Sequence, residues 1–328
     1  MTTSRPAPAP LWKRVEGVVF VTIGLVGLGF ILTGGGTLAE RGSFVFIALA
    51  AVLFMWAERA KPYNPEQGLF RTGFWTDFVG YCLVQSFVLG VVIGRIVGWL
   101  DVNTGWSQYK LVSDWPIAAQ VAFFILTHDL YIYWFHRWQH RSPTLWRLHE
   151  AHHSVPQVDW LSGVRSHSLE ILVNQTIEYA PMILLGASPE VPVIKGAISA
   201  VWGMWIHSNL DVRMGKLQYV INGPEMHRWH HADDPEAYDT NFSTKFAFWD
   251  WMFGTAYFPD PAAKKAQAYG LGYPGWPEGS PMAYVEQHIQ AFKAPLRPDL
   301  QPGRGGHVDS EAAAPEAPAA DLQGSSAR

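Results

Sequence analysis

Residues 128–154 read HDLYIYWFHRWQHRSPTLWRLHEAHHS, and this stretch joins the end of an apolar segment to a dense set of histidines. It contains the boxes HRWQH (136–140) and HEAHH (149–153), and a third box, HRWHH (227–231), follows later. Eleven of the thirteen histidines in the chain lie between residues 128 and 231. The chemistry of the protein is therefore expected in this region.

The spacing inside the boxes is that of a metal site. Side chains three or four residues apart share one face of a helix, so the imidazoles of a box can converge on one point. Neutral imidazole is a ligand for zinc, copper, iron and nickel. A single zinc ion takes three or four protein ligands, so eight box histidines indicate two metal ions side by side. The eight are His136, His140, His149, His152, His153, His227, His230 and His231.

Apolar segments before the boxes predict an integral membrane protein, because a transmembrane helix needs about 20 apolar residues. Sixteen tryptophans and twelve tyrosines fit a chain with aromatic rings at a membrane–water interface. In the third segment Asp77 and Arg95 lie near the ends, where they are expected to reach toward the interface. Asp114 and Pro116 read as the N-cap and first turn of the fourth. The four predicted spans are 17–33, 43–57, 76–100 and 116–135.

Loop charges predict the orientation. Three Lys or Arg residues lie in the N-terminal tail and three in the loop 58–75, whereas the loops 34–42 and 101–115 carry one each. The positive-inside rule then places the N-terminus and the histidine boxes in the cytoplasm. A second apolar pair, 169–185 and 191–206, turns at 186–189 and returns the chain to that side whether or not it crosses fully.

The predicted organisation is a tail (1–14), N-terminal transmembrane helices (15–114), a catalytic domain (115–258), a C-terminal extension (259–294) and a disordered tail (295–328). The formal net charge of −4 gives no sign of a nucleic-acid partner. Cys82 is the only cysteine, which excludes an intramolecular disulfide and a cysteine metal cluster. The fold class is thus all-α: a multi-span membrane bundle with a cytoplasmic histidine-rich cap.

The boxes and their flanks resemble the fatty acid hydroxylase/sterol desaturase superfamily of membrane enzymes. The resemblance covers about residues 115–258. It rests on the order of DxxxYWFHRxxH, HxxHHS, HSN, HRWHH and FWDWMFGT, which here occupy 129–140, 149–154, 207–209, 227–231 and 248–255.

The resemblance implies a histidine-ligated centre of two iron ions that uses dioxygen and external electrons to hydroxylate or desaturate a lipid C–H position. The eight box histidines would be the ligands, and His207 would be a ninth, because it stands between the second and third boxes. His167 is open between a ligand, a substrate-side residue and a structural hydrogen-bond partner. His128 is expected to be structural.

Carboxylates and amides near the boxes are candidates to orient the imidazoles, because a metal-bound histidine usually donates its second N–H to a carboxylate or carbonyl. Asp129, two turns before His136, is the first candidate. Asn209, Asp239 and Asn241 are further ones.

Two alternatives of other classes remain open. HEAHH fits the HExxH pattern of zinc metalloproteases with Glu150 as general base, although that reading leaves the other two boxes unexplained. A non-catalytic metal-binding membrane protein is the second. The favoured hypothesis is a lipid monooxygenase, with a desaturase sharing the same centre. Its substrate could be a sterol, a carotenoid, a fatty acyl chain or an amino-acid-containing lipid.

The sequence contains no flavin, haem-attachment or credible nicotinamide motif, so a separate redox protein is expected to deliver the electrons. The composition fits a bacterial inner membrane. The oligomeric state stays open.

Overall fold

All regular elements are helical in the part of the chain that the computed structural model describes, residues 36–260 and 264–296, apart from two isolated β-bridges. The predicted all-α class is confirmed. The predicted first span, 17–33, and nearly all of the predicted disordered tail lie outside the described residues. The helices are α2 (Leu38–Ala60), the π-helix η1 (Thr76–Gln85), α3 (Ser86–Thr104), the 3-10 turn η2 (Trp106–Tyr109), α4 (Ile117–Arg141), α5 (Pro143–His153), η3 (Ser162–Val164), α6 (Ser168–Leu184), α7 (Glu190–His207), η4 (Gly215–Tyr219), α8 (Pro224–His230), α9 (Phe248–Phe253) and α10 (Ala283–Gln290).

Three segments are long and apolar enough to cross a membrane: α2, the continuous η1–α3 segment Thr76–Thr104, and α4. They correspond to the predicted spans 43–57, 76–100 and 116–135. Each continues beyond its predicted C-terminal end, and α4 runs through the whole first histidine box to Arg141. Hydropathy alone ends this helix too early because the polar ligands occupy its last turns.

Two local expectations were wrong. Asp114 is not the N-cap of α4: Pro116 holds that position with an extended ψ of 141°, so the helix begins only after it. Asp77 does not reach the interface: it is fully buried, 2.6 Å from the guanidinium of Arg71 and 2.6 Å from that of Arg165. A buried carboxylate needs such partners, whereas Arg95 is exposed.

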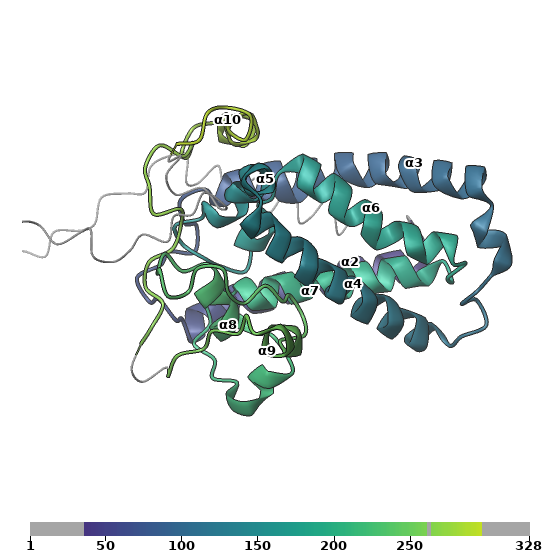
Figure 1. Ribbon diagram of the computed structural model, residues 1–328, viewed down its shortest axis with the longest axis horizontal. Coiled ribbons are helices and arrows are strands. Elements are labelled where there is room, and N and C mark those ends of the chain that lie inside the picture. The colour runs from purple at the N-terminus through teal and green to yellow at the C-terminus, as the bar shows by residue number, and fades with distance from the viewer. Residues whose placement is uncertain (1–35, 261–263, 297–328) are drawn as a thin grey trace, which may run out of the picture.

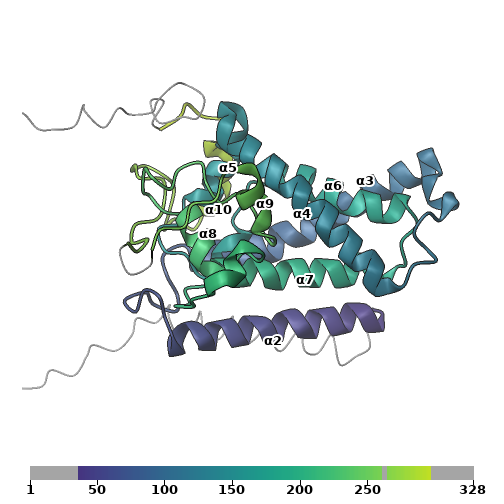
Figure 2. The same ribbon diagram turned by 60° about the horizontal axis from the view of Figure 1, so that its bottom comes forward.

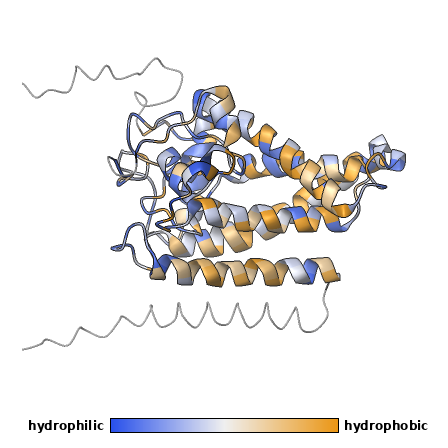
Figure 3. Cartoon of the chain, turned by 90° about the horizontal axis from the view of Figure 1, so that it is seen from below, coloured by the Kyte–Doolittle hydropathy of each residue, from blue (hydrophilic) through white to orange (hydrophobic). Residues whose placement is uncertain are grey.

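The long helices run side by side along the length of the molecule, and the histidine boxes gather at one end (Figures 1 and 2). α6 and α7 form the predicted hairpin, in which α7 packs against α2 and α4 while α6 packs against α3. Figure 3 shows hydrophobic colour along the bundle and hydrophilic colour concentrated at the end with α5 and α8. With a rise of 1.5 Å per residue, α6 and α7 are about 25 and 27 Å long, slightly less than the roughly 30 Å of a hydrocarbon core.

Candidate metal centre

Four helices deliver the histidines to one place. The C-terminal end of α4 carries the first box, α5 carries the second, the last residue of α7 is His207, and α8 with the residue after it carries the third. Each of the nine side chains is at most 8% exposed. They form a group of five (His136, His140, His149, His153 and His230) and a group of four (His152, His207, His227 and His231), and the ligand atoms of each group lie within 4.8 Å of one another.

The two groups adjoin each other. The ring centroids of His152 and His231, within the group of four, are 4.6 Å apart, and His231 is 4.7 Å from His153 in the group of five. His230 and His231, neighbours in the chain, point into different groups. Two groups of imidazoles, each of which could hold a cation, therefore lie side by side.

The chemistry of the donor atoms fits a bound cation. The Nδ1 atom of His136 donates to the carbonyl of Phe242 at 2.8 Å, and that of His149 lies 3.0 Å from the carboxylate of Glu170. A neutral imidazole whose Nδ1 donates has a bare lone pair on Nε2. The two Nε2 atoms nevertheless face each other at 3.1 Å. Facing lone pairs repel unless a cation lies between them.

The group of four repeats this arrangement. His207 donates from Nδ1 to the carbonyl of Gly203 at 2.9 Å. Its Nε2 then faces the Nε2 atoms of His227 at 3.0 Å, His231 at 3.2 Å and His152 at 3.4 Å. In the group of five, the buried Nε2 atoms of three further rings have no hydrogen-bond partner; these are His140, His153 and His230.

Burial also favours the neutral, unprotonated form of these rings, which is the form that binds a metal ion. Desolvation lowers the pKa of His149 and of His152 to about 3. Since metal ions bind the unprotonated imidazole, ligands that stay neutral at physiological pH are ready to coordinate without first losing a proton.

Backbone carbonyls, more than side chains, hold the rings in place. His152 donates to the carbonyl of Arg165 at 3.0 Å and His230 to the carbonyl of Thr240 at 2.8 Å. Glu170 is the one carboxylate within hydrogen-bond distance of a ligand ring in the described part of the chain. The sequence reasoning missed it, although a glutamate at the start of the apolar segment 169–185 was a signal that could have found it.

Asn241 acts through the backbone on either side of it. The carbonyls of Thr240 and Phe242, its two neighbours, accept the hydrogen bonds of His230 and His136. Asn241 itself is fully buried and has a φ of 55°, in the left-handed region that few side chains adopt. This conformation sets the directions of both neighbouring carbonyls.

The carboxamide of Asn241 fixes that conformation. Its Nδ2 atom donates to the carbonyls of Met226 at 3.0 Å and Tyr257 at 2.8 Å, and its Oδ1 accepts from the Tyr257 N–H at 2.8 Å. Asn241 is thus a positioning residue, although its side chain touches no imidazole.

The other predicted orienting residues differ from expectation. The carboxylate of Asp129 accepts hydrogen bonds from Thr244, Lys245, Phe246 and Trp249 and from none of the rings, so it fixes the loop after Phe242. That loop needs a buried acceptor because its N–H groups turn inward.

Asn209 bonds to the backbone of Asn64 instead of a ring. The Asp239 carboxylate lies 3.6 Å from Nδ1 of His140, at ion-pair distance.

His167 and His128 lie outside both groups. His167 accepts the N–H of Leu169 at the start of α6, and its other ring nitrogen lies 3.3 Å from the carbonyl of His288. His128 lies 3.1 Å from the Lys195 ammonium. Both rings have protein partners of their own, which explains why they are not turned toward the ligands.

Glu150 does not face the histidines. Its carboxylate pairs with Arg147 and accepts the hydroxyl of Tyr273, and it is fully buried. The HExxH interpretation requires this carboxylate beside the metal as general base. Glu150 is therefore not placed to act as the general base that the metalloprotease alternative requires.

The fold and the site together define a helical protein with candidate membrane spans and a buried histidine cluster that can bind metal. Residues 121–255 match the sequence model of the fatty acid hydroxylase family. The chain therefore contains a fatty acid hydroxylase domain over these residues, and the predicted resemblance is confirmed for them.

The relatives of this chain include enzymes named for lipid oxidation. An ornithine lipid hydroxylase of Rhizobium tropici is 34% identical over 147 residues, which are 45% of this chain and 44% of the relative. Alkylglycerol monooxygenases of Danio rerio and Homo sapiens are 34% and 30% identical, each over 52% of this chain and 37% of the relative. The chain thus spans less than half the length of these relatives. No solved structure matches it.

Proposed function

We propose that the protein is a membrane-bound di-iron monooxygenase that hydroxylates a C–H bond of a lipid with dioxygen. The observation that carries the proposal is the pair of adjoining histidine groups, five and four imidazoles, at the polar end of an apolar bundle. The names of the relatives support a lipid hydroxylase. The three candidate membrane spans support a substrate that arrives from the bilayer.

Two iron ions held by these nine imidazoles would supply, with dioxygen and electrons from a separate redox protein, the oxidation of the C–H bond. The chain itself would position the substrate and exclude water from the site. The imidazoles are almost fully buried, and backbone carbonyls orient four of them, which keeps bulk water away from the rings. The Glu170 carboxylate raises the basicity of His149 through their hydrogen bond.

The names of the relatives and the loop charges guide the proposals on substrate and membrane. The relatives are named for an ornithine lipid and for alkylglycerol, and each of these molecules carries polar groups beside an alkyl or acyl chain. We propose a membrane lipid of this kind in preference to a free hydrocarbon. A bacterial relative supports the inner membrane, and the excess of Lys and Arg in the N-terminal tail and the 58–75 loop supports a cytoplasmic site.

Comparative lipidomics of a host with and without the gene tests the proposal, with His152→Ala as the inactive control. Gain of one oxygen atom by a lipid, lost in the variant, is expected. Loss of two hydrogen atoms would instead make the enzyme a desaturase. Unchanged lipids with bound metal would favour a non-catalytic metal protein, and metal analysis that finds one zinc and no iron per chain would overturn the di-iron assignment.

A further inference from the structure

The helix α10 has an apolar side that no described part of the protein covers. Met282, Val285, Ile289 and Phe292 are 55%, 41%, 48% and 70% exposed, and their spacing of three, four and three residues places them along one face. On the opposite face Gln287 is fully buried. This helix belongs to the C-terminal extension, beyond the matched domain 121–255.

Polar contacts fix which side of α10 faces outward. The Gln287 carboxamide accepts the hydroxyl of Tyr81 at 2.8 Å and donates to the carbonyl of Pro277 at 2.7 Å. At the end of the helix, the guanidinium of Arg147 donates to the carbonyl of Gln290. α10 therefore cannot roll to bury its apolar side without breaking buried hydrogen bonds.

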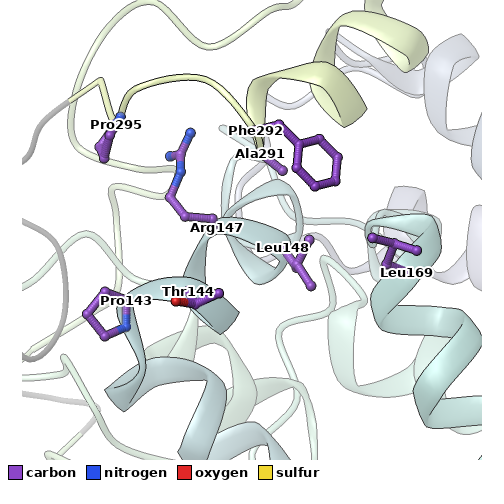
Figure 4. Close-up of a pocket in the computed structure, with 8 residues that line it drawn as sticks. All are labelled: Pro143, Thr144, Arg147, Leu148, Leu169, Ala291, Phe292 and Pro295. Carbon is purple, nitrogen blue, oxygen red and sulfur yellow. The ribbon is translucent and has the colours of Figure 1, made fainter.

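The apolar side of α10 continues into the outer face of the bundle. A groove of about 440 Å³ lies between α10, α5 and α6, and Figure 4 shows Phe292, Leu148 and Leu169 along it. Leu169 begins an exposed apolar row on α6 that continues through Val173 and Ile177. This row lies beside α3, part of a candidate span.

The position and direction of α10 are those of an interfacial helix. Tyr81, its partner, lies near the start of the span Thr76–Thr104, at the polar end of the bundle. Figure 1 shows α10 nearly end-on while α3 and α6 run along the picture, so α10 lies across the spans. Lys293, exposed beside Phe292, fits the level of lipid phosphates.

Exposed aromatic residues on the opposite side of the bundle lie at a level similar to that of α10. Figure 1 shows α9 across the bundle from α10 at a similar position along its length. The Tyr219 and Trp251 rings, 4.6 Å apart, are exposed there together with Met252. Exposed aromatic rings of this kind are enriched where a protein meets lipid headgroups.

We propose that α10 lies in the membrane interface with Val285, Ile289 and Phe292 among phospholipid acyl chains, and that an acyl chain occupies the groove toward Leu169. A helix with a large apolar face and a fixed polar side buries that face at the boundary between headgroups and chains. The C-terminal extension is then a second membrane contact that holds the α5 face against the bilayer.

Site-directed spin labelling of the full chain in nanodiscs of phosphatidylethanolamine and phosphatidylglycerol tests the proposal. In a Cys82→Ser background, nitroxides at Val285→Cys and Ile289→Cys are compared with a lipid control, Val91→Cys on α3, and a water control, Glu66→Cys. Accessibility to oxygen relative to a nickel chelate is expected to lie well above that of the water control and below that of Val91→Cys, which stands near the middle of its span.

A ratio like that of the water control would overturn the proposal. So would low accessibility to both reagents, because that result means that protein covers the face, either another segment of this chain or a second copy. Metal content and melting temperature equal to those of the Cys82→Ser parent establish that each labelled chain is folded. Phe292→Cys gives the same readout if one of the two variants fails this check.

Discussion

Replacement of Asn241 is the sharpest test of how this site is built, because its side chain touches no ligand. Asn241→Ala removes three buried hydrogen bonds, one to the carbonyl of Met226 and two to the backbone of Tyr257. Each buried bond lost costs about 1–1.5 kcal/mol. Alanine at a φ of 55° adds about 1 kcal/mol. The expected destabilisation is about 4–5.5 kcal/mol.

Asn241→Gly separates the two contributions. Glycine loses the same hydrogen bonds but adopts the left-handed conformation freely, so this variant is expected to be about 1 kcal/mol more stable than Asn241→Ala. Lys110→Gly is the control for the backbone contribution alone, because Lys110 has a φ of 49° on the exposed surface and glycine adopts that conformation freely. It should gain about 1 kcal/mol of stability and lose no metal.

Metal retention decides whether Asn241 positions the ligands. The assay is metal per chain after dialysis against a graded series of chelator concentrations, followed beside thermal melting in detergent. If the carbonyls of Thr240 and Phe242 turn, His230 and His136 lose their orientation, and metal affinity should fall about 10–100-fold. An Asn241→Ala protein that melts early yet retains metal like the native chain would refute the reasoning.

Three further predictions follow from the same contacts. Glu170→Gln should weaken metal binding about 10-fold or more with little change in melting, measured by chelator competition; unchanged affinity would show that the bond to His149 does not tune the ligand. His207→Ala should leave the protein with about half its metal, because it opens the group of four, whereas His167→Ala should keep full occupancy; equal losses would contradict the assignment of His207. Asp77→Asn should destabilise the fold by about 3–5 kcal/mol through the unpaired guanidiniums, whereas Asp114→Asn at the exposed surface should melt within a degree or two of the native chain.

Most of what the sequence could predict about the site came from the spacing of the histidines within each box. In a helix, the interval between His149 and His153 determines that both rings point one way, whatever the rest of the fold does. His207 is different, because a lone histidine at the end of an apolar segment has no local pattern. Only the family resemblance predicted it, and the structure brings it to the group of four.

The orienting contacts were less predictable, because they join residues far apart in the chain. Phe242 and His136 are separated by 106 positions, and the atom involved is a carbonyl that every residue possesses. A sequence search for orienting groups finds carboxylates such as Asp129 but cannot recognise a backbone acceptor. The left-handed φ of Asn241 had a weak local signal, since asparagine tolerates that region better than most residues.

The register of α4 and α7 explains why His136 and His207 meet at one level. α4 brings its first ligand, His136, to the polar end after 19 residues of helix, and α7 brings His207 there as its last residue after 17. One inserted residue would move His207 by about 1.5 Å along the axis and turn it by about 100° about it, which takes the ring out of a group whose donor atoms span only 4.8 Å. The apolar segments therefore do more than hold the protein in a membrane. Their lengths set where His136 and His207 stand, so the bundle and the candidate metal centre are specified by the same residues.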